Sequence, residues 1–271
     1  MNKILLIGCG HMGSALLEAW TKQTKNIFSV IDPKQYKLIN KKFTKRVSAF
    51  QTIKQIKNIV QFDIIIFAIK PQLSKSILQE FKSYQFKNNT VFVSIVAGKK
   101  INFFYQFLKQ ETQFIRIMPN MPAMINEGMS CLIGNKKVTL KNKKKIEVLF
   151  NMVGETLWLK NESDINKVTA ISGSGPGYIF SLIDAFEKSA MQLGLGEKIT
   201  KKLVHQTFDG SIKLFIAKKI SAKILAKNIA VKGGTTEAGL NEFKKNQILK
   251  KIFTKVIKAA YIKANLLGKK N

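Results

Sequence analysis

The sequence has very few of the residues on which several classes of protein depend. Of 271 residues only two are cysteines and two are histidines, and the cysteines, Cys9 and Cys131, lie far apart. A disulfide framework or a cysteine-ligated metal site would therefore lack ligands. No apolar run approaches the roughly 20 residues that a membrane-spanning helix needs. We expect a cytoplasmic protein with no metal site and no membrane contact.

Arginine is scarce as well, although the chain is strongly basic. Lys and Arg total 46 against 16 Asp and Glu, a formal net charge of +30, yet Arg46 and Arg116 are the only arginines. A polyanion-binding surface would explain the charge, but proteins that bind nucleic acids usually rely on Arg for bidentate contacts. The lysines are also spread along the whole chain in short pairs. We therefore expect compositional bias and no nucleic-acid partner.

The first half of the chain alternates short apolar runs with helical spacing. Alternation of this kind predicts a doubly wound α/β sheet of parallel strands with helices on both faces. A further strand is predicted over 155–159, and beyond residue 161 only helical periodicity follows. The predicted strands are 4–8, 27–31, 63–69, 90–96 and 114–118. The predicted helices are 12–21, 178–193, 200–215 and 247–267. The apolar helix 178–193 is too hydrophobic for one small domain to cover, so we expect subunit contact.

The first predicted strand runs into a glycine-rich loop, Gly8-Cys9-Gly10-His11-Met12-Gly13. This G-x-G-x-x-G pattern lies between a strand and a helix, and Asp32 follows 19 residues later at the end of the second strand. That context is typical of a Rossmann-like dinucleotide site: the glycines permit a tight turn, close approach of the pyrophosphate and helix packing. Helix N–H groups would then face the phosphates.

The same loop leaves the choice of dinucleotide open. A carboxylate at Asp32 would accept hydrogen bonds from ribose hydroxyls, which favours NADH. Lys34 and Lys37 follow closely and could pair with the extra phosphate of NADPH. Cys9 and His11 are interpreted as packing and loop residues, since no acid or base nearby would orient them for catalysis.

Two further segments follow predicted strands. Phe67-Ala68-Ile69-Lys70-Pro71 ends a buried strand, and ligands bind at the carboxyl ends of strands in such sheets, so Lys70 is expected to face ligand and not merely solvent. Arg116-Ile117-Met118-Pro119-Asn120-Met121-Pro122 forms a rigid loop in which Arg116 is either a buried structural ion or a ligand-positioning group.

Two glycine segments lie in the helical half. Ser172-Gly173-Ser174-Gly175-Pro176 leads into the long apolar helix, and Gly233-Gly234-Thr235-Thr236 precedes a later one. Glycine and hydroxyl residues commonly cap helices, but the second loop is also well made to hold a carboxylate. Together with the first loop, these segments resemble the pyrroline-5-carboxylate reductase family along nearly the whole chain.

The resemblance implies an NAD(P)H-dependent enzyme that reduces a cyclic imine carrying a carboxylate, 1-pyrroline-5-carboxylate, to L-proline, a step of proline biosynthesis. It implies a Rossmann-like dinucleotide-binding domain over residues 1–160 and an all-α substrate-binding and dimerisation domain over 161–271, with assembly as dimers or decamers. The implied catalytic residues are Thr236, which would contact the ring nitrogen, and Lys70. The implied cofactor contacts are Ile7, Gly8, Cys9, Gly10, His11, Met12, Gly13, Asp32, Pro33, Ala68, Ile69, Lys70, Ala97 and Asn228. The implied substrate contacts are Ser174, Gly233, Gly234, Thr235 and Thr236.

The sequence departs from the family pattern before the second loop. Val231-Lys232 replace the usual Ser-Pro, and no acidic residue near Lys219 matches a substrate-binding Glu of some members. Two alternatives therefore stay open. One is a related reductase such as a 3-hydroxyacid dehydrogenase, although the helix start 178–184 lacks the Lys typical of those enzymes. The other is a non-catalytic protein that binds a dinucleotide or a nucleic acid on the same fold.

Overall fold

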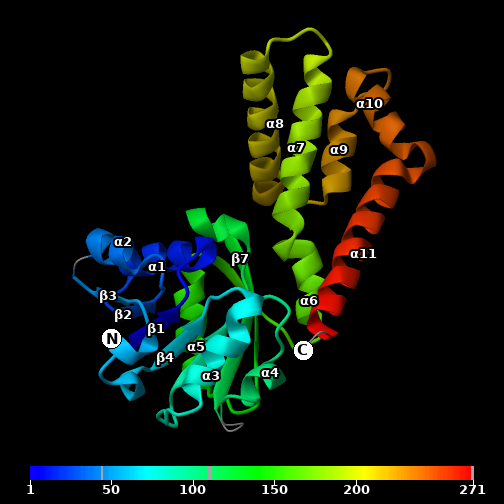
Figure 1. Ribbon diagram of the computed structural model, residues 1–271. Helices are drawn as coiled ribbons and strands as arrows, with labels where there is room; N and C mark the ends of the chain where they lie inside the picture. Colours follow the sequence, from blue (N-terminus) through cyan, green and yellow to red (C-terminus); the bar gives the residue numbers. More distant parts are fainter. Residues whose placement is uncertain (44, 109–111, 270–271) are drawn as a thin grey trace. The chain divides into compact units, whose positions relative to one another are not determined.

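The strands form one sheet in which the first six strands run parallel to one another. The computed structural model describes residues 1–43, 45–108 and 112–269, and within these the sheet has the order β3-β2-β1-β4-β5-β6-β7-β8 (Figure 1). β7 runs antiparallel to β6, and β8 runs parallel to β7. The strands are β1 (Lys3–Ile7), β2 (Ile27–Ile31), β3 (Val47–Phe50), β4 (Ile64–Phe67), β5 (Val91–Ser94), β6 (Gln113–Met118), β7 (Gly128–Gly134) and β8 (Gly154–Trp158).

Helices cover both faces of this sheet, as the alternating pattern predicts. Alternate residues of β1 enter different apolar clusters: Ile4 and Leu6 pack on one face, and Leu5 and Ile7 on the other. Strands buried on both sides need continuous apolar sequence, which is why β1, β4 and β5 could be predicted. The helices of this region are α1 (His11–Gln23), α2 (Tyr36–Lys42), α3 (Ser74–Phe81), α4 (Ile101–Tyr105), α5 (Leu140–Asn151) and α6 (Asp164–Val168). The doubly wound α/β fold class is confirmed.

The chain divides into two compact units. The sheet unit comprises Met1–Ser174 with Ala260–Asn271, and the helical unit comprises Gly175–Ala259. The last helix therefore begins in the helical unit and ends in the sheet unit. There Asn166 Nδ2 donates a hydrogen bond to Asn265 Oδ1 at 2.8 Å.

The helical unit consists of α-helices and one short 3-10 helix, Lys245–Gln247, joined by turns. No residue of α7 is buried within the single chain, in keeping with the apolar face that the sequence analysis assigned to subunit contact. Gly194, at φ +88°, lies three residues beyond the end of α7, in the left-handed conformation that glycine commonly adopts after a helix. The α-helices of the helical unit are α7 (Gly175–Met191), α8 (Glu197–Lys218), α9 (Ala222–Ile229), α10 (Thr235–Lys244) and the first part of α11 (Ile248–Lys269). Throughout the described ranges, every helix is too short or too polar to traverse a lipid bilayer.

Candidate functional site

The carboxyl ends of the central strands bring the predicted cofactor residues to one edge. Ile7 of β1 lies opposite Ile31 of β2 and Phe67 of β4 in the parallel register. The next residues, Gly8, Asp32 and Ala68, therefore leave the sheet at the same level. Backbone hydrogen bonds fix this arrangement, since Gly8 N donates to Ile31 O at 2.8 Å and Ala68 N donates to Ile7 O at 2.7 Å.

The three glycines of the first loop meet different surroundings. Gly8 has φ +91°, and a Cβ there would lie 2.5 Å from the Ala68 carbonyl oxygen. A Cβ on Gly13 would lie 2.5 Å from the Gly8 carbonyl oxygen. A Cβ on Gly10, in contrast, would have no atom within 4 Å and would fill open space above the helix start. Gly8 and Gly13 are thus required by packing, whereas Gly10 leaves room that a ligand's pyrophosphate fits.

The N-terminus of α1 presents backbone N–H groups to this space. Gly10 is its N-cap and supplies no side-chain hydrogen bond, and the first turn contains no acidic residue. The first N–H groups of a helix have no intrahelical partners and carry a partial positive charge. The open glycine and the uncapped helix start together fit the diphosphate of a dinucleotide.

Asp32 is held firmly by backbone donors. Its Oδ2 accepts a hydrogen bond from Cys9 N at 2.7 Å, and its Oδ1 accepts from Lys34 N and Gln35 N at 2.9 Å each. The carboxylate thus links the glycine loop to the turn that follows β2. Pro33 lies exposed in that turn.

The two reactive side chains of the loop are not arranged for covalent catalysis. Cys9 is buried, and burial, aided by the charge of Asp32, raises the pKa of its thiol to about 11. Such a thiol stays protonated at neutral pH and is a poor nucleophile. His11 and Met12 begin α1, and His11 is exposed.

Two neighbouring strands add the remaining predicted contacts at this edge. Ile69 and Lys70 follow β4, and Lys70 is exposed at the start of the turn that Pro71 begins. Ser94 of β5 lies opposite Phe67 of β4, so Ala97, three residues beyond β5, reaches the same edge. The structure therefore brings together every predicted cofactor residue of the sheet unit.

Arg116 is buried and forms an ion pair with Glu162 within the sheet unit. Its side chain is 5% exposed, and Nη1 lies 3.0 Å from Glu162 Oε1. The same carboxylate oxygen accepts a hydrogen bond from Ile101 N at 2.8 Å. Burial lowers the pKa of the guanidinium and the Glu162 charge opposes that shift. Of the two roles considered for Arg116, this geometry supports the structural one.

Asn120 has a bridging role that sequence reasoning did not find. Its Nδ2 donates to the Ser172 carbonyl at 3.0 Å, and its Oδ1 accepts from Met129 N at 2.7 Å. The bridge reaches the π-helical turn Thr169–Gly173, in which Ser174 N donates to Thr169 O at 2.8 Å. An asparagine between two prolines was the available signal, but its partners lie far along the chain.

The second glycine loop belongs to the helical unit. Gly233 has φ +75°, and its N–H donates to Glu237 Oε2 at 2.8 Å. Gly234 is the N-cap of α10 without a side-chain hydrogen bond, and, unlike α1, α10 has an acidic residue, Glu237, in its first turn. Thr235 is exposed and Thr236 is half-buried. Asn228 is an exposed residue of α9 in the same unit.

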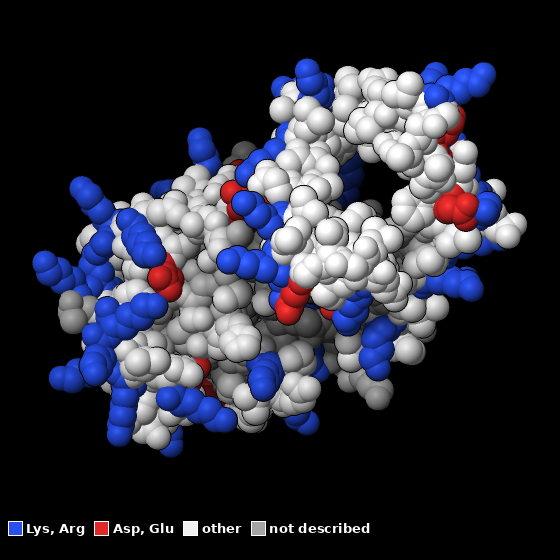
Figure 2. Space-filling view, turned by 90° about the horizontal axis from the view of Figure 1, so that it is seen from above, with Lys and Arg blue, Asp and Glu red and all other residues white. Residues whose placement is uncertain are grey.

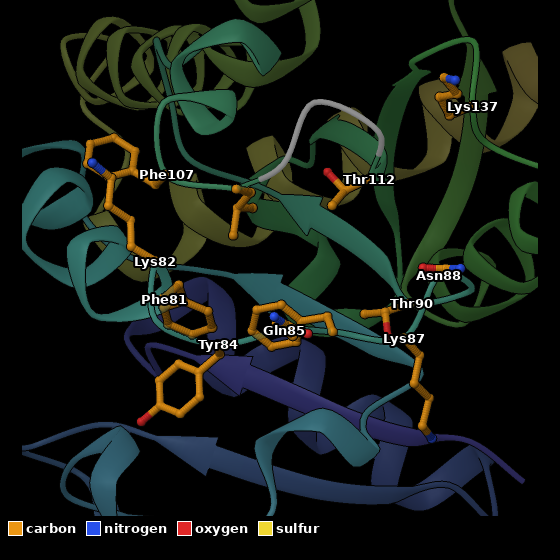
Figure 3. A pocket seen from close by; sticks show the side chains of 12 residues that line it. Phe81, Lys82, Tyr84, Gln85, Lys87, Asn88, Thr90, Phe107, Thr112 and Lys137 are labelled. Carbon is orange, nitrogen blue, oxygen red and sulfur yellow. The ribbon is translucent and has the colours of Figure 1, made fainter.

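A separate cavity of about 410 Å³ lies at the opposite edge of the sheet (Figure 3). Thr90 and Thr112, which precede β5 and β6, line it, and Lys82 Nζ lies 5.6 Å from the centroid of the Phe107 ring. The described lining residues include no carboxylate, cysteine or histidine. Among the described residues there is also no cluster of potential metal ligands. The predicted cofactor residues lie at the carboxyl edge, away from this cavity.

Basic and acidic side chains are both present on the face seen in Figure 2. Figure 2 shows Lys and Arg side chains projecting all around the visible face, with acidic side chains among them. Several lysines pair with acidic residues one helical turn away, for example Lys188 with Asp184 and Lys213 with Asp209. Such exposed pairs contribute little to stability.

Comparison with known proteins identifies relatives of both halves. Residues 162–267 match the family described as pyrroline-5-carboxylate reductase dimerisation, and residues 3–98 match NADP oxidoreductase coenzyme F420-dependent. The chain is 31% identical over 252 residues to pyrroline-5-carboxylate reductase of Pasteurella multocida (strain Pm70), covering 91% of each protein.

Solved structures extend the likeness to the whole fold. Pyrroline-5-carboxylate reductase from Coxiella burnetii superimposes with a TM-score of 0.88 at 27% identity, covering 98% of each chain. Pyrroline carboxylate reductase of Plasmodium falciparum, solved with NADP bound, gives a TM-score of 0.84 at 27% identity and the same coverage.

Proposed function

The chain belongs to the pyrroline-5-carboxylate reductase family, and from this premise we propose that it reduces 1-pyrroline-5-carboxylate to L-proline with NADH or NADPH. The observation that carries the proposal is the 31% identity over 91% of both proteins. The glycine loop and open α1 N-terminus at the carboxyl edge of the sheet support it, because they suit the dinucleotide that this reaction needs.

The protein's part in the reaction is binding and orientation. The nicotinamide supplies hydride when bound, so no nucleophilic enzyme group is required. The backbone at Gly8, Gly10 and Gly13, with the α1 N-terminus, holds the diphosphate, and Lys70 lies at the same edge. This assignment agrees with the protonated, buried thiol of Cys9.

The loop of the helical unit holds the substrate in our proposal. The first N–H groups of α10 and the hydroxyl of Thr235 bind the carboxylate. Gly233 and Gly234 form the turn beside it, and their own N–H groups donate to Glu237 Oε2 and Val231 O. Thr236 contacts the ring nitrogen and holds it for protonation, which makes the adjacent carbon electrophilic. Ser174, at the end of the π-helical turn, completes the substrate contacts. The resemblance of the Gly-Gly-Thr-Thr core to the family supports these roles.

We propose the same division of labour as the sequence suggests, with cofactor binding in residues 1–160 and substrate binding and dimerisation in 161–271. The family match over 162–267 supports self-association through the helical half. α7, none of whose residues is fully buried in the single chain, gives such a dimer an apolar face to cover, and dimers would assemble further into decamers. Two buried, free cysteines agree with a reducing cytoplasm.

A steady-state assay tests the function directly. We expect oxidation of NADH or NADPH to depend on 1-pyrroline-5-carboxylate. With simple keto acids, the substrates that a 3-hydroxyacid dehydrogenase would reduce, we expect negligible oxidation. Turnover of the keto acids alone would favour the related dehydrogenase. An absence of turnover with all substrates, combined with salt-sensitive DNA binding, would favour the non-catalytic alternative.

A further inference from the structure

Asp32 occupies the position at which NADH and NADPH differ, and we propose that it makes the chain prefer NADH. The inference rests on the proposed function, since it concerns the cofactor of that same site. NADPH carries one additional phosphate, on the 2′ oxygen of the adenosine ribose. In this fold the residue at the end of the second strand lies beside that oxygen. Asp32 follows β2 directly and shares the edge with Gly8.

Hydrogen bonds from two segments fix the position of the Asp32 carboxylate. Oδ1 accepts from Lys34 N and Gln35 N, and Oδ2 accepts from Cys9 N. A carboxylate offers about four lone-pair positions, two on each oxygen. Oδ1 is therefore fully used, and Oδ2 keeps one position. Swinging the carboxylate away from a ligand would break hydrogen bonds on both sides, so the charge stays where it is.

The remaining lone pair on Oδ2 distinguishes the two cofactors. A ribose 2′-hydroxyl can donate its proton to that position and form a charge-assisted hydrogen bond. A 2′-phosphate is an acceptor and brings negative charge next to a carboxylate that cannot move. The fixed carboxylate thus stabilises the bound 2′-hydroxyl of NADH and repels the 2′-phosphate of NADPH.

Neither arginine of the chain is free to compensate that repulsion. Sites for NADPH commonly use an Arg near the ribose. Arg46 instead donates hydrogen bonds to the carbonyls of Thr21 and Thr24 at the C-terminal end of α1, and Arg116 is paired with Glu162. Lys34 and Lys37 are close in sequence but exposed, where solvent screens their charge. The fixed carboxylate therefore dominates the local discrimination.

Calorimetric binding to the full chain tests the preference without turnover. We expect the Kd for NADPH to exceed that for NADH by about tenfold or more. The same ranking is expected for adenosine 2′,5′-bisphosphate against 5′-AMP, which differ only by the 2′-phosphate. Asp32→Asn removes the charge but keeps an acceptor for the turn, so we expect the Kd ratio to fall by about tenfold.

Asp63→Asn is the matched control. The Asp63 carboxylate also accepts a backbone hydrogen bond, from Lys3 N at 2.9 Å, but it precedes β4 at the other edge of the sheet. We expect this variant to keep the wild-type Kd ratio. Thermal unfolding of both variants checks that each is folded, and the wild-type comparison itself requires no variant.

Two results would overturn the proposal. One is a wild-type chain that binds NADPH as tightly as NADH or more tightly. The other is a preference for NADH that persists unchanged in folded Asp32→Asn. Binding of NADH without reduction of 1-pyrroline-5-carboxylate would instead reject the proposed function and leave the cofactor preference standing.

Discussion

The two glycine loops have similar helix-capping residues but are held in place by different contacts. Each contains a glycine N-cap that offers no side-chain hydrogen bond, Gly10 before α1 and Gly234 before α10. The first loop is fixed by distant parts of the chain, because Gly8 fits against Ala68 and Cys9 N is bound by Asp32. The second is fixed locally, by the Glu237 carboxylate four residues beyond Gly233.

The comparison separates shape from chemistry. A loop embedded between strands depends on the fold, so a change there disturbs both stability and binding. A loop held by one nearby carboxylate can change its contacts while the helices around it remain. The following substitutions test that distinction, in order of decreasing expected effect.

Gly8→Ala should be the most damaging substitution. The left-handed φ of +91° and the Ala68 oxygen at 2.5 Å both oppose a Cβ, so we expect the free energy of unfolding to fall by about 2 to 4 kcal/mol. Gly10→Ala is the control within the same loop, since its Cβ meets nothing within 4 Å. Urea denaturation should give Gly10→Ala a nearly wild-type free energy of unfolding. A separate binding measurement should show that the variant has lost dinucleotide affinity. Equal destabilisation by both variants would contradict the packing argument.

Thr236→Ala should remove activity without removing cofactor binding. Loss of a hydroxyl that contacts the reacting imine is expected to lower kcat/KM by about 100-fold, while the Kd for dinucleotide stays the same. Thr254→Ala serves as control, because its hydroxyl only donates to the Lys250 carbonyl one turn earlier in α11. A Thr236→Ala variant with wild-type kcat/KM would refute the catalytic assignment.

Glu237→Ala should have a smaller effect, confined to the substrate. Without its carboxylate the Gly233 N–H loses its partner, and the loop is expected to hold the substrate less well, raising KM about fivefold, as the loss of about 1 kcal/mol would. Glu242→Ala removes an exposed carboxylate that pairs with Lys245 and should leave KM unchanged. A fall in melting temperature as large as that of Gly8→Ala would remove the contrast between the loops.

Cys9 should give the smallest effect, visible mainly through pH. Because its pKa is raised from 9.0 to about 11, the thiol is protonated in the folded chain where it ionises in the unfolded one. Stability present below pH 9 is therefore expected to decline as pH rises toward about 11. Mass spectrometry should find Cys9 unalkylated by iodoacetamide at pH 8 in the native protein. Cys9→Ala should retain turnover and lessen that decline.

Sequence reasoning succeeded where a continuous pattern carried the information. β1, β4 and β5 are apolar apart from Lys3 and Ser94 at strand ends, and the G-x-G-x-x-G motif places a binding loop within six residues. β3 and β7 were not predicted. β3 spans only Val47–Phe50, and β7 begins and ends in glycine with Ser130 and Cys131 at its centre, so neither has a long apolar run.

The unpredicted parts of the site depend on contacts between distant residues. Asp32 could be expected beside the ribose, but its hydrogen bond to Cys9 N spans 23 positions. The pairing of Arg116 with Glu162 spans 46, and the bridge from Asn120 to Ser172 spans 52. Local periodicity contains no information on such pairs, because they arise only when separate strands and turns meet.

The return of α11 to the sheet unit has a consequence for the order in which the chain can be completed during synthesis. Ala264 is buried there, and a Cβ on Gly98 would lie 3.2 Å from Leu267 Cβ. The 85 residues of Gly175–Ala259 must therefore leave the ribosome before the last turns of α11 can pack in the sheet unit. The part that is translated first is finished last, and a ribosome stalled within the helical unit would leave the sheet unit without its closing segment.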